Sequence, residues 1–349
     1  MGVIESTRGV LWARKQAPDE PAYGVSLAHE RFAPDELLRQ AVAAEEAGFD
    51  AIACSDHLAP WWAEDQPAPN NSGNAWVWLG AVGNATSEAS IGTAVTGVIH
   101  RYNPVVVAQQ IATLEILNPG RTFLGVGSSE AMNEIPAGLS WPGVSEQLER
   151  LDEALEIITR LLDGETVTFE GEHFRTRDAR LYSLPDRRPP VYVSAFGERA
   201  AEIAGRRGDG LWTLADPSQA PGVIAAYRRA REEAGKDAGE IVLQALFSWA
   251  SDDQEAFASA REWKATIPPE HYTEAIHDPA EIQARGEEVS DREFKAGAIV
   301  GSDPAAHVRK IKAIAQLGAS AIVLMNVSAA DPIAALRVYG EEVLPALRD

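Results

Sequence analysis

Short apolar runs alternate with helical segments along this chain, and the alternation restricts the folds open to it. The run at 121–126 is β-branched, bounded by turn residues and too short for a core helix, which is typical of a buried strand. In chain order the runs are residues 22–28, 49–54, 89–95, 121–126, 191–194, 209–214, 241–249, 296–300 and 319–326. Strands that alternate with helices without an intervening linker favour a parallel sheet wrapped by helices.

About eight strand–helix units fit into the 349 residues. That number favours an α/β fold of the (β/α)8 TIM barrel type over a two-domain, doubly wound protein. A Rossmann domain is further disfavoured because no Gly-x-Gly-x-x-Gly follows the first strand. We therefore predict one barrel domain over residues 1–349, with an N-terminal extension at 1–21. Insertions are expected near 58–76, 165–190 and 251–292, and the last of these is acidic and poorly periodic.

Charge and cysteine content exclude several classes of function. The formal net charge of −21 disfavours binding to nucleic acid or to an anionic membrane surface. No apolar stretch approaches the roughly 18 residues of a membrane span, and the first residues lack a signal-peptide core. Cys54 is the only cysteine, so a disulfide framework and a paired-cysteine metal site are excluded. We expect a cytoplasmic enzyme without a metal, because the histidines also lack ligand-like spacing.

One glycine-rich stretch is typical of a ligand site. Gly125 and Gly127 remove the side chains from the C-terminal end of the strand at 121–126, and two serines and Glu130 follow. In a parallel barrel the site lies at the C-terminal ends of the strands. This rule brings together a set of segments from different strands: Glu30, Asp56-His57, Ala94-Val95, Gly127 to Glu130, Ser194 to Gly197, and Trp212.

Asp56 and His57 directly follow the second predicted strand. A histidine there is suited to accept a proton near neutral pH, since its ordinary pKa is about 6.5. Asp56 would fix the tautomer of His57 or contact a cofactor. The alternative is that Asp56 caps a turn and His57 is a structural hydrogen-bonding residue. The predicted convergence with Glu130 favours the catalytic interpretation.

Glu130 would be a carboxylic acid in a partly buried barrel mouth, where desolvation lets it hold a proton. Alternatively it complements a helix dipole from the first turn. Four tryptophans lie within eighteen residues of a polar loop, and they are expected to form a flat wall for a ring-shaped ligand, although core packing is an alternative for each. They are Trp61, Trp62, Trp76 and Trp78.

At these residues the chain resembles the luciferase-like superfamily, and within it the coenzyme F420-dependent glucose-6-phosphate dehydrogenase group. The matching segments are Ser55–Trp61 (Ser-Asp-His-Leu-Ala-Pro-Trp), Arg101–Pro104 and Phe123–Glu134. Weaker matches are Pro190–Val193 and Gly205–Gly210. They follow the same order over nearly the whole chain.

The resemblance implies an F420-dependent dehydrogenase acting on the CH–OH group of an alcohol or sugar, with the fold of a (β/α)8 barrel and a homodimeric assembly. By analogy His57 is the base that removes the hydroxyl proton, and Glu130 is the acid that protonates the deazaflavin ring nitrogen. Trp61 screens the reacting centre, and Trp61, Glu30 and Trp78 contact the substrate. A bulged or cis Ala94-Val95 peptide backs the cofactor ring. The cofactor-binding positions are Asp56, Ala94, Val95, Gly127, Ser128, Asn133, Ser194, Ala195 and Gly197.

The chain departs from this group where the group binds the substrate phosphate. The segment after the sixth strand is Leu214-Ala-Asp-Pro217, with an acid and a proline in place of a hydroxyl and an amine. A desolvated phosphate dianion beside Asp216 would be repelled by several kcal/mol. We therefore expect a neutral or weakly polar alcohol as the substrate. Glucose-6-phosphate oxidation with a rebuilt phosphate site, FMN-dependent monooxygenation and non-catalytic F420 carriage remain the alternatives.

Overall fold

The computed structural model describes residues 20–63 and 70–349. Nearly all of the predicted extension at 1–21 and the middle of the insertion near 58–76 therefore lie outside the described residues. Within them, eight parallel strands close into a barrel, because β12 pairs with both β10 and β1. Its strands are β1 (Ala22–Leu27), β2 (Ala51–Cys54), β3 (Ser90–Thr93), β5 (Thr122–Gly127), β8 (Val191–Ser194), β9 (Gly210–Leu214), β10 (Glu240–Trp249) and β12 (Ala321–Asn326). The predicted (β/α)8 TIM barrel is confirmed.

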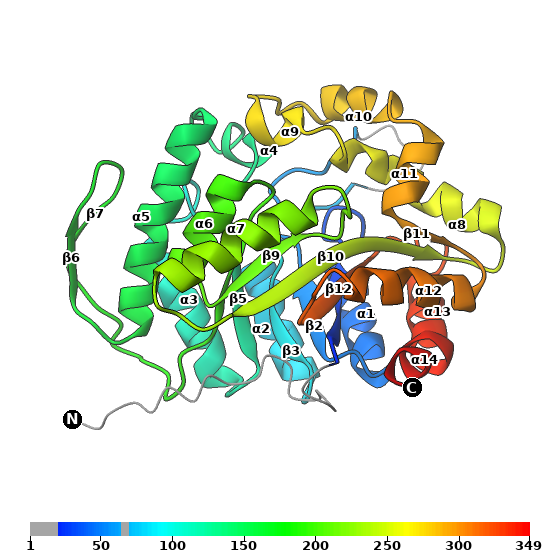
Figure 1. Cartoon of the computed structure of the whole chain (residues 1–349), viewed down its shortest axis with the longest axis horizontal. Coiled ribbons are helices and arrows are strands. Elements are labelled where there is room, and N and C mark those ends of the chain that lie inside the picture. The colour runs from blue at the N-terminus through cyan, green and yellow to red at the C-terminus, as the bar shows by residue number, and fades with distance from the viewer. Residues whose placement is uncertain (1–19, 64–69) are drawn as a thin grey trace.

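Helices cover the outside of the barrel (Figure 1). Several begin as the sequence indicates: Pro34 opens the first with acidic residues in its first turn, and Asn103 caps the third by accepting a hydrogen bond from Val105 N–H. The outer helices are α1 (Pro34–Glu46), α2 (Ala75–Ala85), α3 (Pro104–Leu117), α5 (Val144–Leu162), α6 (Glu198–Arg207), α7 (Ala220–Glu233), α12 (Pro304–Ala315), α13 (Pro332–Val338) and α14 (Leu344–Arg348). A π-helical turn, Tyr339–Val343, joins the last two.

The two later insertions have different structures. The segment at 165–190 contains an antiparallel hairpin, β6 (Val167–Glu170) and β7 (Arg175–Ala179), which extends beside α5 (Figure 1). The segment at 251–292 instead folds into short helices that lie over one end of the barrel (Figure 1). They are α8 (Asp253–Ala260), the 3₁₀ helix η1 (Arg261–Thr266), α9 (Glu270–Thr273), α10 (Pro279–Glu287) and α11 (Asp291–Gly297).

The predicted strand at 296–300 is wrong as a barrel strand. Ala296 and Gly297 belong to the last turn of α11, and the strand β11 (Ile299–Gly301) pairs only with β10. Residues 247–249 of β10 are its partners, just beyond the stretch that pairs with β9. A short apolar run does not distinguish a helix end from a strand, which explains the error.

The strands β3 and β5 approach each other most closely at glycine residues. A Cβ atom at Gly92 would lie 2.2 Å from the carbonyl oxygen of Phe123 and 2.6 Å from its ring. A Cβ atom at Gly125 would lie 2.1 Å from the carbonyl oxygen of Thr93. Gly125 is therefore required by the neighbouring strand, which differs from the prediction that it makes room for a ligand.

We predict that Gly92→Ala destabilises the protein by about 2 kcal/mol or more, because the added methyl group overlaps backbone that cannot move independently. Gly297→Ala is the matched control, since a Cβ atom there meets nothing within 4 Å. The control is expected to leave stability unchanged or to raise it by up to about 1 kcal/mol. Equilibrium unfolding in urea measures both, and equal stabilities of the two variants would contradict the prediction.

Candidate functional site

The C-terminal ends of five barrel strands bring the predicted site residues together. We call this end of the barrel the mouth. Glu30 follows β1, Asp56 and His57 follow β2, and Glu130 follows β5. The Ala94-Val95 peptide, which follows β3, is cis as the resemblance suggested. Ser194, the last residue of β8, is partly exposed, and Ala195 N–H donates to the carbonyl oxygen of Trp212 at 2.9 Å.

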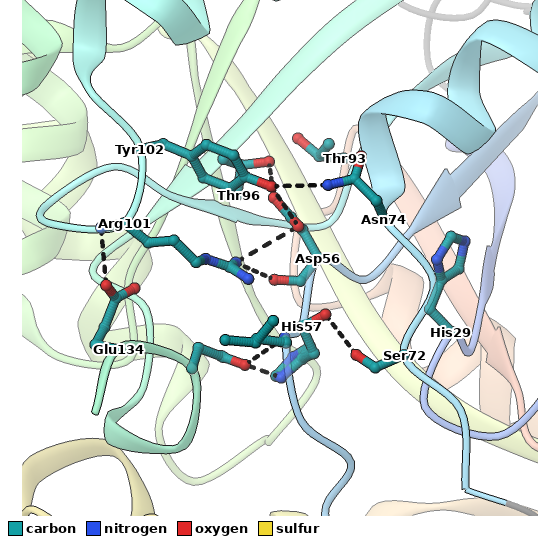
Figure 2. A network of polar contacts seen from close by, with 12 residues as sticks. His29, Asp56, His57, Ser72, Asn74, Thr93, Thr96, Arg101, Tyr102 and Glu134 are labelled. Atoms are coloured by element: carbon teal, nitrogen blue, oxygen red, sulfur yellow. Dashed lines mark hydrogen bonds and ion pairs between the residues drawn. The ribbon is translucent and has the colours of Figure 1, made fainter. Parts of the chain in front are cut away.

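Glu30 and His57 face each other in the mouth. Glu30 is 1% exposed, and its Oε1 lies 3.4 Å from Nε2 of His57. Its other carboxylate oxygen accepts a hydrogen bond from the Ser55 hydroxyl at 2.7 Å. The Ser72 hydroxyl donates to the main-chain oxygen of His57 at 2.5 Å, which holds the residue from its backbone (Figure 2). A carboxylate thus lies beside the histidine that the sequence predicts as the base.

Glu130 occupies the N-cap position of the four-residue helix α4 (Ala131–Glu134), but its side chain makes no capping hydrogen bond. Instead Oε2 of Glu130 accepts a hydrogen bond from Nδ2 of Asn133 at 2.8 Å. The same Asn133 nitrogen lies 3.2 Å from Nδ1 of His57. Asn133 therefore connects the predicted acid to the predicted base.

Asp56 is buried in a polar network of its own (Figure 2). Thr96 donates to Oδ2 at 2.8 Å, Tyr102 donates to Oδ1 at 3.3 Å, and a guanidinium nitrogen of Arg101 lies 3.5 Å from Oδ1. Burial and the charge of Asp56 raise the pKa of Tyr102 to about 12. The expectation that Asp56 fixes the tautomer of His57 is wrong, because Glu30 and Asn133 contact the two ring nitrogens.

The segment at 101–104 is part of the family resemblance, but no function is predicted for its residues from the sequence. The structure shows that Arg101 also donates a side-chain hydrogen bond to the carbonyl oxygen of Asp56 at 2.7 Å. Its backbone N–H donates to Glu134, whose pKa is raised by burial (Figure 2). Neither Glu134 nor Thr96 was predicted. Their side-chain types are common at helix starts and strand ends, and only the packed structure pairs them with Arg101 and Asp56.

The four tryptophans do not form one wall. The ring of Trp61 lies near His57, with centroids 5.2 Å apart. Trp62 packs edge-on against Trp263, and Trp76 lies on the outside of the barrel between α2 and α3. Trp78 is 4% exposed, contacts His29 edge-on, and donates to the carbonyl oxygen of Pro34. Packing therefore explains Trp62, and Trp78 is held by His29 and Pro34.

The insertion at 251–292 covers the mouth. Tyr272 of α9 packs on Trp61 at a centroid distance of 5.9 Å and edge-on against Phe196 at 5.2 Å. Burial raises the pKa of Tyr272, and the charges of Glu130 and Glu30 add to this effect. An ion pair of 2.7 Å between Arg31 and Glu262 ties the insertion to the loop after β1. The structure thus gives this segment a place in the site.

Residues 20–63 and 70–349 are the part of the chain that the structure describes. Within them, no three His, Cys, Asp or Glu side chains are grouped so that they could hold a metal ion. Within the same residues, no helix has the length and apolar character needed to cross a membrane.

Comparison with known proteins places this geometry in a family. The chain is 37% identical to the F420-dependent glucose-6-phosphate dehydrogenase of Microbacterium testaceum, over 93% of this chain and 97% of that protein. It is 38% identical to the F420-dependent hydroxymycolic acid dehydrogenase of Mycobacterium tuberculosis, over 95% of this chain and 89% of that protein.

A solved F420-dependent secondary alcohol dehydrogenase, in complex with an F420-acetone adduct, superposes with a TM-score of 0.90 at 32% identity, over 95% of this chain and 100% of that one. The family profile described as luciferase-like monooxygenase matches residues 8–321. The resemblance found in the sequence is therefore confirmed, and the chain belongs to the luciferase-like family.

Proposed function

We propose that this protein is an F420-dependent dehydrogenase that acts on the CH–OH group of an unphosphorylated alcohol or sugar. The observation that carries the proposal is the continuous polar chain Glu30–His57–Asn133–Glu130 at the barrel mouth. A dehydrogenase of this kind needs a proton acceptor at the substrate oxygen and a proton donor at the cofactor ring. The relatives named F420-dependent dehydrogenases support the same activity.

The start of α6 suits a cofactor with a phosphate-bearing tail. A Cβ atom at Gly197, the N-cap of α6, would meet nothing within 4 Å, so its backbone is open to approach. Helix N-termini favour phosphate groups. When bound, F420 supplies the hydride acceptor. We propose that it is held by the positions expected from the resemblance: Asp56, Ala94, Val95, Gly127, Ser128, Asn133, Ser194, Ala195 and Gly197.

The protein's own residues have separate roles in the proposed reaction. His57 and Glu30 form the unit that binds the substrate hydroxyl and accepts its proton, since they lie 3.4 Å apart in a buried setting. Glu130 holds the proton that is delivered toward the cofactor ring. Trp61 and Tyr272 exclude water from the reacting centre by packing over it.

We predict that the purified protein binds F420 more tightly than FMN and that an alcohol bleaches the bound F420.

His57→Asn is expected to retain F420 binding and to lower the oxidation rate by about 10²-fold, because proton transfer at the substrate oxygen is impaired. His277→Asn, which changes an exposed histidine, is the matched control. Tighter binding of FMN with oxygen consumption would indicate the monooxygenase alternative. F420 binding without turnover of any alcohol would indicate a carrier.

The end of β9 supports the choice of an unphosphorylated substrate. Asp216 accepts hydrogen bonds from Ser218 N–H and the Ser218 hydroxyl, both at 2.7 Å, and from Gln219 at 3.1 Å. Partial burial opposes ionisation, but these hydrogen bonds outweigh it and lower the pKa of Asp216. A small pocket next to this carboxylate is lined by Phe196 and Leu214, both more than 40% exposed. An anion beside apolar side chains favours a neutral substrate.

We predict that a secondary alcohol is oxidised with a kcat/KM at least tenfold above that for glucose 6-phosphate. Asp216→Asn is expected to lower the ratio of the kcat/KM for the alcohol to that for glucose 6-phosphate by about tenfold. This change corresponds to the removal of about 1.4 kcal/mol of repulsion between the carboxylate and the phosphate. Asp186→Asn, at an exposed carboxylate before β8, is the control for net charge. Steady-state kinetics on both substrates measures the ratio. A wild-type preference for glucose 6-phosphate would refute the assignment of substrate class.

We propose that the protein is a homodimer joined through the outer faces of α2 and α3. Val77 on α2 is 78% exposed and Leu117 on α3 is 69% exposed. A groove of about 280 Å³ lies between the two helices and is lined by Trp76, Leu114 and Leu117, among others. Exposed apolar side chains beside a groove support an interface here, and the homodimers implied by the resemblance make a second copy the proposed occupant.

We predict that Val77→Glu/Leu117→Glu converts the dimer into a monomer, because four carboxylates would be buried at the interface of each dimer. Tyr182→Glu is the control, since it changes an 84% exposed aromatic side chain elsewhere. Light scattering coupled to gel filtration measures the mass. A wild-type monomer, or a double variant that remains dimeric, would exclude this interface.

We also propose a cytoplasmic location. Cys54 is fully buried, so no cysteine is exposed among the described residues. Burial also raises the pKa of its thiol. A chain with one buried thiol has no need of an oxidising compartment.

A further inference from the structure

Asn133 is the best-connected side chain between the acid and the base. It is 1% exposed and lies in α4. Its Oδ1 accepts a hydrogen bond from the backbone N–H of Leu58 at 2.8 Å. Its Nδ2 lies 2.8 Å from Oε2 of Glu130 and 3.2 Å from Nδ1 of His57. Both polar atoms of the amide are therefore in use, toward partners on two different strand ends.

The Leu58 contact determines which way the amide points. A backbone N–H only donates, so the atom of Asn133 that faces it must be the carbonyl oxygen. The reverse orientation would place an N–H₂ group against the N–H of Leu58 and would lose that hydrogen bond. Nδ2 therefore faces Glu130 and His57, and its two hydrogens serve one partner each.

This orientation determines the state of the His57 ring. Since Nδ2 of Asn133 donates, Nδ1 of His57 must accept, and in the neutral ring the proton is then on Nε2. Nε2 faces Oε1 of Glu30. We propose that Asn133 is a positioning residue that fixes His57 in the Nε2–H tautomer. The catalytic meaning of this tautomer rests on the dehydrogenase function proposed above.

The tautomer assigns separate roles within the His57–Glu30 unit. An Nε2 that already carries a proton donates a hydrogen bond to the substrate oxygen. The proton that leaves the substrate hydroxyl is then taken by the Glu30 carboxylate. In this step the substrate O–H bond breaks and an O–H bond forms on Glu30, and bound F420 would be the acceptor of the hydride from the carbinol carbon. The role of base, which the resemblance implies for His57, thus passes to its neighbour.

Glu30 favours the same tautomer, because its carboxylate Oε1 faces Nε2 and accepts a hydrogen bond from it when Nε2 carries the proton. The remaining groups around His57 do not account for the tautomer. Asp56, the adjacent residue, bonds to Thr96, Tyr102 and Arg101. Ser72 bonds only to the main-chain oxygen of His57. Replacing Asn133 therefore changes a contact to the ring of His57, whereas replacing Ser72 changes only a contact to its backbone.

The variant Asn133→Asp tests the proposal in the protein without cofactor. This change keeps an oxygen for Leu58 N–H but puts a second acceptor against Nδ1 of His57. The double variant Asn133→Asp/Glu130→Gln removes the repulsion between the two carboxylates, in case the single variant does not fold. Ser72→Ala is the matched control, because it removes a hydrogen bond to His57 that does not involve the ring.

The measurement is ¹⁵N NMR of histidine-labelled protein at about pH 8, above the ordinary histidine pKa. His57 is assigned by the signals that are lost in His57→Asn. The wild type and Ser72→Ala are expected to show a protonated Nε2 and an unprotonated Nδ1. In the Asn133→Asp variants Nδ1 is expected to shift to the protonated position. A wild-type proton on Nδ1, or an unchanged tautomer in both Asn133 variants, would overturn the proposal. Because the measurement is made without cofactor, the tautomer that it reports does not depend on whether the protein uses F420.

Discussion

The site depends on how closely β3 and β5 pack against each other. Glycines at 92 and 125 let each strand's carbonyl oxygen enter the space where the other would carry a side chain. Beyond them, a Cβ atom at Gly127 would lie 2.9 Å from the side chain of Val95. Larger residues at these positions would separate the strands and displace the loops at their C-terminal ends. The cis peptide after β3 and Glu130 after β5 are therefore placed by a constraint on the backbone.

Much of the fold and the centre of the site are predictable from sequence patterns. Alternating strands and helices predict the barrel, and the rule that strand ends carry the site brings His57 and Glu130 together. Local patterns have limits, however. The short apolar run at 296–300 ends a helix and starts a strand that lies outside the barrel, because pairing with β10 depends on where β9 stops. Which residues of β10 pair with β9 and which pair with β11 is decided only in the assembled sheet.

Side-chain direction was harder to predict than side-chain type. Tryptophan at 61, 62, 76 and 78 suggested one surface, yet the rings point to the mouth, the core and the outside of the barrel. The partners of Asp56 come from residues 96, 101 and 102, after β3 and 40 or more residues away, so no local spacing reveals them. The role of Asn133 likewise depends on a backbone N–H 75 residues away. Composition identified the residue types, and packing decided their contacts.

The cover over the mouth comes from a part of the chain that the barrel does not need for closure. The helices from α8 to α11 lie between β10 and β12, which pair directly with each other. Polar contacts tie them to the barrel, such as the Arg31–Glu262 pair and the hydrogen bond from Ala63 to Gln283. The cover and the strand ends that carry the proposed proton-transfer residues are therefore separate parts of the chain. A change in the length or sequence of the cover would therefore alter the surface over Trp61 and leave the strand ends that carry His57 and Glu130 in place.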